Sequence, residues 1–186
     1  MKALWLIFLL FAASVAQAQT LRVVSVKIQG DDQFPKTIRF FCTQKYPRKR
    51  CVGDAITLRP ILRTYPVINL GSWNFVLASS DEWTDLVRSL GGVPGSPAFS
   101  VLESRTTVFE EALFSAFGRR RAELILMFGT VDRILLEQAV THELGHILCK
   151  DANEIRAAQN GQELLGGRTL VCQDFKQRIY ADTRPH

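Results

Sequence analysis

Hydrophobic and polar residues alternate in patterns that divide the first half of the chain into short elements. Apolar residues, many of them β-branched, alternate over residues 21–28 and predict an opening strand, and residues 38–41 predict a second, shorter strand. Helical spacing of apolar residues over 54–64 predicts a helix, although Pro60 weakens it by removing a backbone donor. The N-terminal part therefore combines strands with a helix.

Further elements follow at short intervals. The apolar run over residues 73–78 predicts a strand. A helix is predicted over residues 79–90, because serines and acidic residues suited to a first helical turn open it and two glycines close it. Residues 99–102 and 106–109 predict a pair of strands or one bent edge strand.

A longer helical pattern dominates the C-terminal part of the chain. It starts near Thr130 or Asp132 and continues through Leu148, with apolar residues on most of its faces, which predicts a largely buried helix. A second helix is predicted from Asn153 to Leu165, where two glycines end it. Strands followed by helices predict the α+β class.

The first eighteen residues have the features of a secretory signal peptide. Lys2 precedes an apolar run, and small residues lead to a cleavage site after Ala18. The run is shorter than the ~20 residues that cross a bilayer, so no membrane anchor is expected after cleavage. Residues 19–186 have a suitable length for one domain, which we expect to be secreted or periplasmic.

Four cysteines remain after the predicted cleavage. In an oxidising compartment an even number of cysteines favours disulfides over metal ligation. The spacing favours a bond between Cys42 and Cys51 and another between Cys149 and Cys172, while the other two pairings stay open. We expect these bonds to be structural, without a chemical role.

The charge of the chain is mildly basic, with a formal net charge of +5. Basic residues gather at 45–50 and at 119–121. They could attract anionic surfaces or acidic substrates, but solvated loops are the favoured interpretation. No nucleic-acid-binding motif accompanies either cluster. We therefore expect no nucleic-acid partner, and the sequence leaves the oligomeric state open.

Candidate chemistry lies in the long C-terminal helix, where His142, Glu143 and His146 form an HExxH motif. Residues four apart lie on one helical face, so the two imidazoles can bind one metal ion. The carboxylate of Glu143 can then act as a general base without being a ligand. Gly145 is unfavourable inside a helix, which predicts the close approach of a strand or a substrate at that point.

Residues 139–148, which read AVTHELGHIL, resemble the active-site helix of the zincin metallopeptidases. The resemblance implies a zincin-like fold, in which a small mixed β-sheet packs on the motif helix and a second helix follows. It also implies that an edge strand, expected within 99–109, aligns a peptide or protein substrate. On this basis His142 and His146 bind Zn²⁺, Glu143 is the base, and a third protein ligand lies downstream.

The third ligand departs from well-known zincin patterns. Glu154 lies eight residues after His146, about 12 Å further along a continuous helix, so a turn over residues 150–153 must fold the chain back. Asp151 is the competing candidate and Glu163 a weaker one. The sequence therefore predicts His142, His146 and Glu154 as metal ligands and leaves both alternatives open.

Three functional hypotheses remain at this point. The first is a secreted zinc-dependent peptidase, in which Tyr180, Arg156 or Arg178 could stabilise the oxyanion. The second is a non-catalytic secreted binding domain on a zincin-like scaffold. The third is a disulfide-stabilised domain with an accidental motif, since short motifs carry a risk of chance matches.

Overall fold

The computed structural model describes residues 23–26, 38–65 and 72–172, which form strands, α-helices and short 3₁₀ turns. The strands are β1 (Val23–Val26), β2 (Ile38–Thr43), β3 (Trp73–Ala78), β4 (Ala98–Val101) and β5 (Thr106–Glu110). The helices are α1 (Arg48–Thr64), α2 (Ser80–Ser89), α3 (Arg119–Phe128), α4 (Leu135–Cys149) and α5 (Glu154–Leu165), with 3₁₀ turns η2 (Glu111–Leu113) and η3 (Asp132–Ile134).

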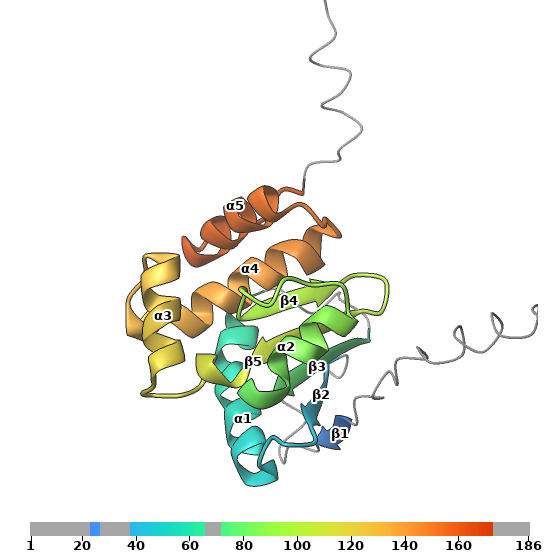
Figure 1. Ribbon diagram of the computed structural model, residues 1–186. Coiled ribbons are helices and arrows are strands. Elements are labelled where there is room, and N and C mark those ends of the chain that lie inside the picture. Colours follow the sequence, from blue (N-terminus) through green and yellow to red (C-terminus); the bar gives the residue numbers. More distant parts are fainter. Residues whose placement is uncertain (1–22, 27–37, 66–71, 173–186) are drawn as a thin grey trace, which may run out of the picture.

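The strands form one mixed sheet in the order β1-β2-β3-β5-β4. The central strands β2, β3 and β5 run parallel, and the outer strands β1 and β4 each pair antiparallel with their neighbour. Strand β4 is the edge strand nearest to α4 (Figure 1). The mixed α+β character predicted from the sequence is confirmed, and residues 99–109 do contain an edge strand beside the motif helix.

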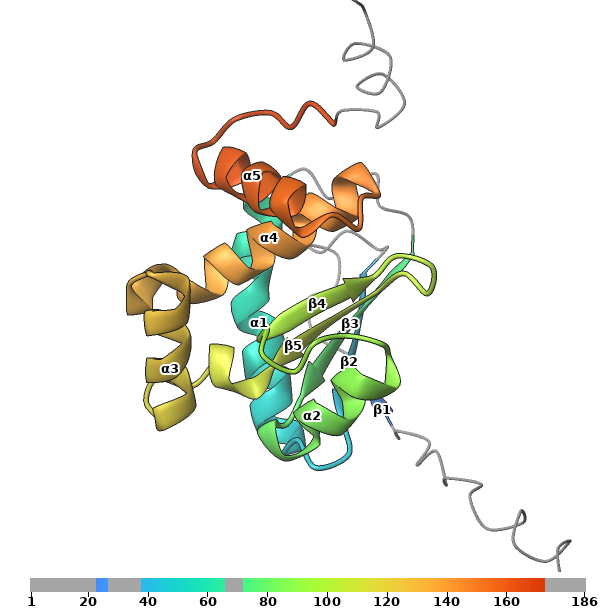
Figure 2. The same cartoon turned by 45° about the horizontal axis from the view of Figure 1, so that its top comes forward.

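Helices cover both faces of the sheet. On one face, alternate strand residues such as Phe75 and Phe109 pack against α1 and α4 in the main core. On the other face, Val76 and Val108 pack against α2. Figure 2 shows α1 and α2 on opposite sides of the strands. Helix α4 packs against β4 on the side of the main core, and the motif helix is therefore mostly buried.

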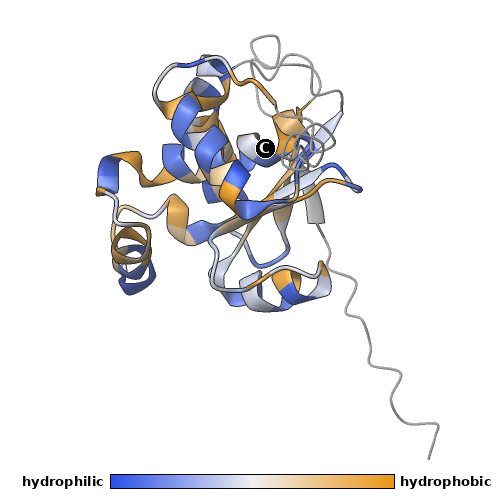
Figure 3. Ribbon diagram, turned by 90° about the horizontal axis from the view of Figure 1, so that it is seen from above, coloured by the Kyte–Doolittle hydropathy of each residue, from blue (hydrophilic) through white to orange (hydrophobic). Residues whose placement is uncertain are grey.

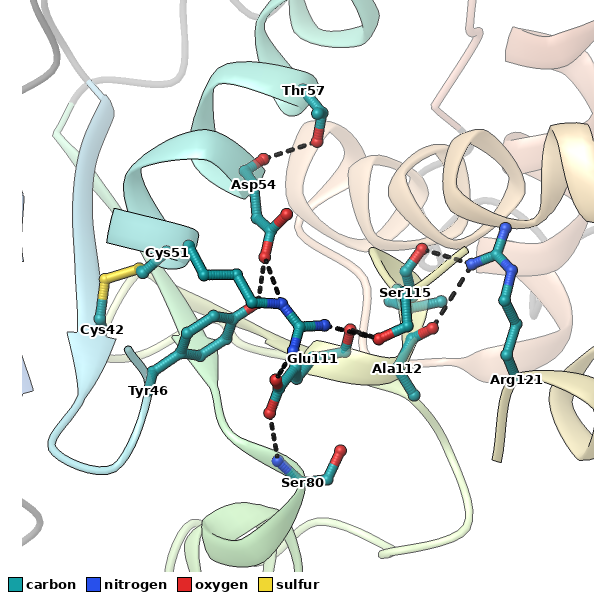
Figure 4. Close-up of polar contacts among 12 residues, drawn as sticks. Cys42, Tyr46, Cys51, Asp54, Thr57, Ser80, Glu111, Ala112, Ser115 and Arg121 are labelled. Carbon is teal, nitrogen blue, oxygen red and sulfur yellow. Dashed lines mark hydrogen bonds and ion pairs between the residues drawn. A yellow bond between two sulfur atoms is a disulfide. The ribbon is translucent and has the colours of Figure 1, made fainter. Parts of the chain in front are cut away.

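Helix α1 starts at Arg48, six residues earlier than the predicted start at residue 54, and it retains Pro60. Polar side-chain contacts stabilise the added turns. The Tyr46 hydroxyl donates to Asp54 Oδ2 over 2.6 Å, a contact visible in Figure 4. Arg50 forms ion pairs with Asp54 and Glu111. A hydrophobic pattern does not include such contacts, which explains why the predicted start was wrong.

Helix α3 was not predicted, because the arginines at 119–121 were assigned to a solvated loop. That assignment was wrong, because Arg119 to Arg121 form the first turn of α3, and residues 48–50 of the other basic cluster likewise begin α1. Arg121 is moreover buried and donates to the carbonyl oxygen of Leu113 over 2.7 Å and to Asp132. Helix α3 changes from hydrophilic to hydrophobic along its length (Figure 3). Its charged residues thus lie in the N-terminal half and its large apolar residues in the C-terminal half.

Both favoured disulfides are present, between Cys42 and Cys51 and between Cys149 and Cys172. The second bond ties the last residue of α4 to the segment after α5. No helix among the described residues has the length and apolar character needed to cross a membrane. The predicted signal peptide, 1–18, lies outside the described residues.

Candidate metal centre

A tight turn reverses the chain between α4 and α5. Helix α4 ends at Cys149, and Lys150 takes the left-handed conformation, with φ of 49°. Asn153 then caps α5, its side chain accepting a hydrogen bond from the backbone of Arg156. The turn expected over residues 150–153 is therefore confirmed, and α5 lies back along α4 (Figure 1).

Two glycines allow α4 and α5 to pack unusually closely. A Cβ on Gly145 would lie 2.5 Å from the backbone oxygen of Ala157, and a Cβ on Gly161 would lie 3.0 Å from the backbone of His142. The predicted close approach at Gly145 is thus real, but the neighbour is the backbone of a helix, not a strand or a substrate. The close contact places the first turn of α5 beside the histidines of α4.

Three candidate ligands meet at this crossing, with donor atoms that all lie within 4.8 Å of one another. Glu154 Oε2 lies 3.1 Å from His142 Nε2 and 3.4 Å from His146 Nε2. Donors about 2.0–2.1 Å from a tetrahedral zinc ion lie about 3.3–3.4 Å apart, close to these distances. The His142, His146 and Glu154 group can therefore hold a metal ion.

The surroundings of both imidazoles suit metal binding. His146 Nδ1 lies 2.6 Å from the carbonyl oxygen of Asp151. Because a carbonyl oxygen only accepts, Nδ1 donates this hydrogen bond, and Nε2 is the ring nitrogen that faces Glu154. Burial and the neighbouring His146 lower the pKa of His142, which favours the neutral ring that metals bind.

The competing third ligands are engaged elsewhere. The Asp151 carboxylate accepts hydrogen bonds from the guanidinium of Arg156 and from the backbone of Asn153. The contact with Arg156 holds the pKa of Asp151 at about 2. Glu163 pairs with Arg168 through both carboxylate oxygens, each at 2.9 Å. Of the three candidates, only Glu154 approaches both histidines.

Glu143, the predicted general base, is buried next to the candidate ligands but is not one of them. The residue is 3% exposed. One of its carboxylate oxygens, Oε2, is buried without a hydrogen-bond partner. Burial raises the pKa of Glu143 to about 8. A cation held by the neighbouring ligands would oppose this shift.

A cavity of about 470 Å³ opens beside the candidate ligands, and His142, Glu143 and Glu154 form part of its wall. Most of the remaining wall is apolar and comes from α3, α4, α5 and the loop before β4. Its large apolar residues are Val93, Met127, Phe128, Leu135 and Leu165. The arrangement combines a small polar cluster with an apolar recess, as small-molecule and peptide sites commonly do.

Some site residues could not be identified from the sequence. Met127 and Phe128 of the cavity wall were not recognised, because the sequence did not predict α3. Arg156 was considered as an oxyanion donor, but its guanidinium is bound to Asp151. The other two oxyanion candidates, Tyr180 and Arg178, lie outside the described residues.

The chain matches no protein-family model, no curated protein and no solved structure. Any assignment of function therefore depends on the geometry and chemistry of this site.

Proposed function

We propose that this protein is a secreted, zinc-dependent peptidase with a zincin-like fold. The observation that carries the proposal is the convergence of His142, His146 and Glu154 beside a buried Glu143 with one unpartnered oxygen. Two imidazoles and a carboxylate are typical protein ligands of catalytic zinc, which keep one coordination position open. A purely structural zinc site would have a fourth protein ligand.

Zinc, when bound, would supply a Lewis acid that polarises the peptide carbonyl and makes water more acidic. His142, His146 and Glu154 would hold it, and the hydrogen bond from His146 to Asp151 orients one ring for that role. Glu143 would accept a proton from the attacking water and deliver it to the leaving amine. Glu143 forms part of the cavity wall, beside the candidate ligands His142 and Glu154.

Two features favour peptides as substrates. Strand β4 has one free edge within the described residues, and an extended peptide can pair with such an edge through backbone hydrogen bonds. The cavity is apolar where Met127, Phe128 and Leu165 line it. We infer a preference for peptides that place a bulky apolar side chain next to the cleaved bond.

The experiment is cleavage of a mixed peptide library by the mature protein, with and without a chelator, beside a Glu143→Gln variant. The proposal predicts chelator-sensitive cleavage next to bulky apolar residues and its loss in the variant, which should still bind zinc. Cleavage retained in Glu143→Gln would contradict the assigned base. Bound zinc without any cleavage would favour the non-catalytic binding domain.

A further inference from the structure

The loop of residues 90–97, between α2 and β4, supplies one wall of the apolar cavity. Hydrogen bonds from outside the loop hold three of its carbonyl oxygens. They run from the Trp83 indole to Pro94 (3.2 Å), from the Arg120 guanidinium to Gly95 (3.1 Å) and from the Glu110 backbone to Pro97 (2.7 Å). These bonds fix the position of this wall.

Arg120 also joins this loop to a second wall of the cavity. It belongs to the first turn of α3, and the other end of that helix carries Met127 and Phe128 of the cavity lining. Helix α3 lies at the edge of the molecule (Figure 1), and Arg121 and Leu124 are its only buried residues. Because α3 buries so little surface, its position depends on its polar contacts.

The contact made by Arg120 is an ion pair with a buried carboxylate. Its Nε lies 3.2 Å from both carboxylate oxygens of Glu110, and its Nη2 lies 3.1 Å from Oε2. Glu110 is the last residue of β5, and its side chain is 4% exposed. Separating a buried carboxylate from its cation is strongly unfavourable, so this pair resists opening. One guanidinium thus connects the sheet, the loop and α3.

We propose that Arg120, bound to Glu110 and Gly95, is a positioning residue that sets the spacing between α3 and the loop of residues 90–97. This spacing determines which apolar side chains the cavity accepts. The selection of substrates rests on the proposed peptidase function. The spacing itself is a property of the folded protein and can be tested without a substrate.

The first test follows backbone hydrogen exchange in the mature protein by mass spectrometry. Arg120→Lys keeps the charge, but an ammonium group lacks the planar fork that contacts Glu110 and Gly95 together. Since a hydrogen bond to a charged group contributes at least about a tenfold factor, exchange in residues 90–98 and in α3 should become about tenfold faster. Arg119→Lys, the same change one residue away, is the matched control, because the Arg119 side chain is 94% exposed and pairs with Glu123 within α3.

Two results would overturn the proposed spacing role, whether or not the protein cleaves peptides. One is exchange in both segments that is equal in Arg120→Lys and Arg119→Lys. The other is faster exchange in Arg120→Lys spread equally over α1 and the central strands, which would indicate a general loss of stability.

The second test compares cleavage of two peptides that differ only in one residue next to the cleaved bond, phenylalanine or alanine. In Arg120→Lys the KM of the phenylalanine peptide should rise about tenfold, because the apolar walls no longer close on the large side chain. Zinc content and kcat should stay unchanged, since the candidate ligands and Glu143 lie on α4 and α5. Arg119→Lys should keep the preference for phenylalanine.

The outcomes separate this proposal from the proposed function. An equal rise in KM for both peptides, or a loss confined to kcat, would overturn the role of Arg120 in selection. Absence of cleavage in the unmodified protein would contradict the peptidase function. Hydrogen exchange would then still decide whether Arg120 holds α3 and the loop together.

Discussion

Replacing Gly145 by alanine tests the helix crossing that brings the candidate ligands together. The added methyl group would lie 2.5 Å from the backbone oxygen of Ala157. Ordinary carbon–oxygen contacts begin near 3.3 Å, so the overlap is about 0.8 Å. Since the opposing atom belongs to the backbone, no side chain can rotate away, and α5 must shift relative to α4.

The magnitude follows from two opposing effects. Forcing extra volume into a packed interior destabilises by about 1–3 kcal/mol, whereas alanine is more favourable than glycine in a helix by about 1 kcal/mol. Gly145→Ala should therefore lower the free energy of unfolding by up to about 2 kcal/mol. Gly53→Ala, in α1 where nothing lies within 4 Å of the new Cβ, should raise it by about 0.5–1 kcal/mol.

The crossing also sets the geometry of the candidate metal site, because Glu154 belongs to the first turn of α5. Zinc–ligand distances vary by only about 0.2 Å, so a shift of several tenths of an ångström should reduce zinc affinity about tenfold or more. Urea unfolding and chelator competition measure the two effects. Equal stability and equal zinc affinity in Gly145→Ala and Gly53→Ala would refute the close packing of the helices.

Three further predictions concern the scaffold and the ligand loop. Arg121→Met should destabilise the protein by about 1–3 kcal/mol in urea unfolding, because it leaves the buried carbonyl oxygen of Leu113 without a donor; an unchanged midpoint would contradict this role. Replacing Cys149 and Cys172 together by serine should lower the free energy of unfolding by about 2–4 kcal/mol. A loss of less than about 1 kcal/mol would show that this disulfide hardly restricts the unfolded chain. Asp151→Asn should loosen the loop that orients His146, a candidate ligand, and weaken zinc binding about tenfold in chelator competition, so unchanged affinity would count against it.

The helix that carries the two candidate histidine ligands could be predicted because its signals are local. Two histidines and a glutamate stand at fixed spacing in an otherwise apolar helical pattern. The spacing of Glu154 also required a turn, and the structure places that turn at residues 150–153, where the chain reverses. Both conclusions needed only helix geometry and the chemistry of the ligands.

The remaining features depend on contacts between distant residues. Helix α3 was not predicted because Arg121 depends on two partners outside the helix, Leu113 and Asp132. The large apolar residues of the helix also gather at one end. Gly145 did signal a close approach, but only the structure shows that α5 makes it.

The most direct test of the central claim is the zinc content of the purified mature protein. We predict one zinc per chain in the unmodified protein and in Glu143→Gln, and little or none in His146→Ala. A protein without zinc, or undiminished zinc in His146→Ala, would contradict the assignment of these side chains as a metal centre.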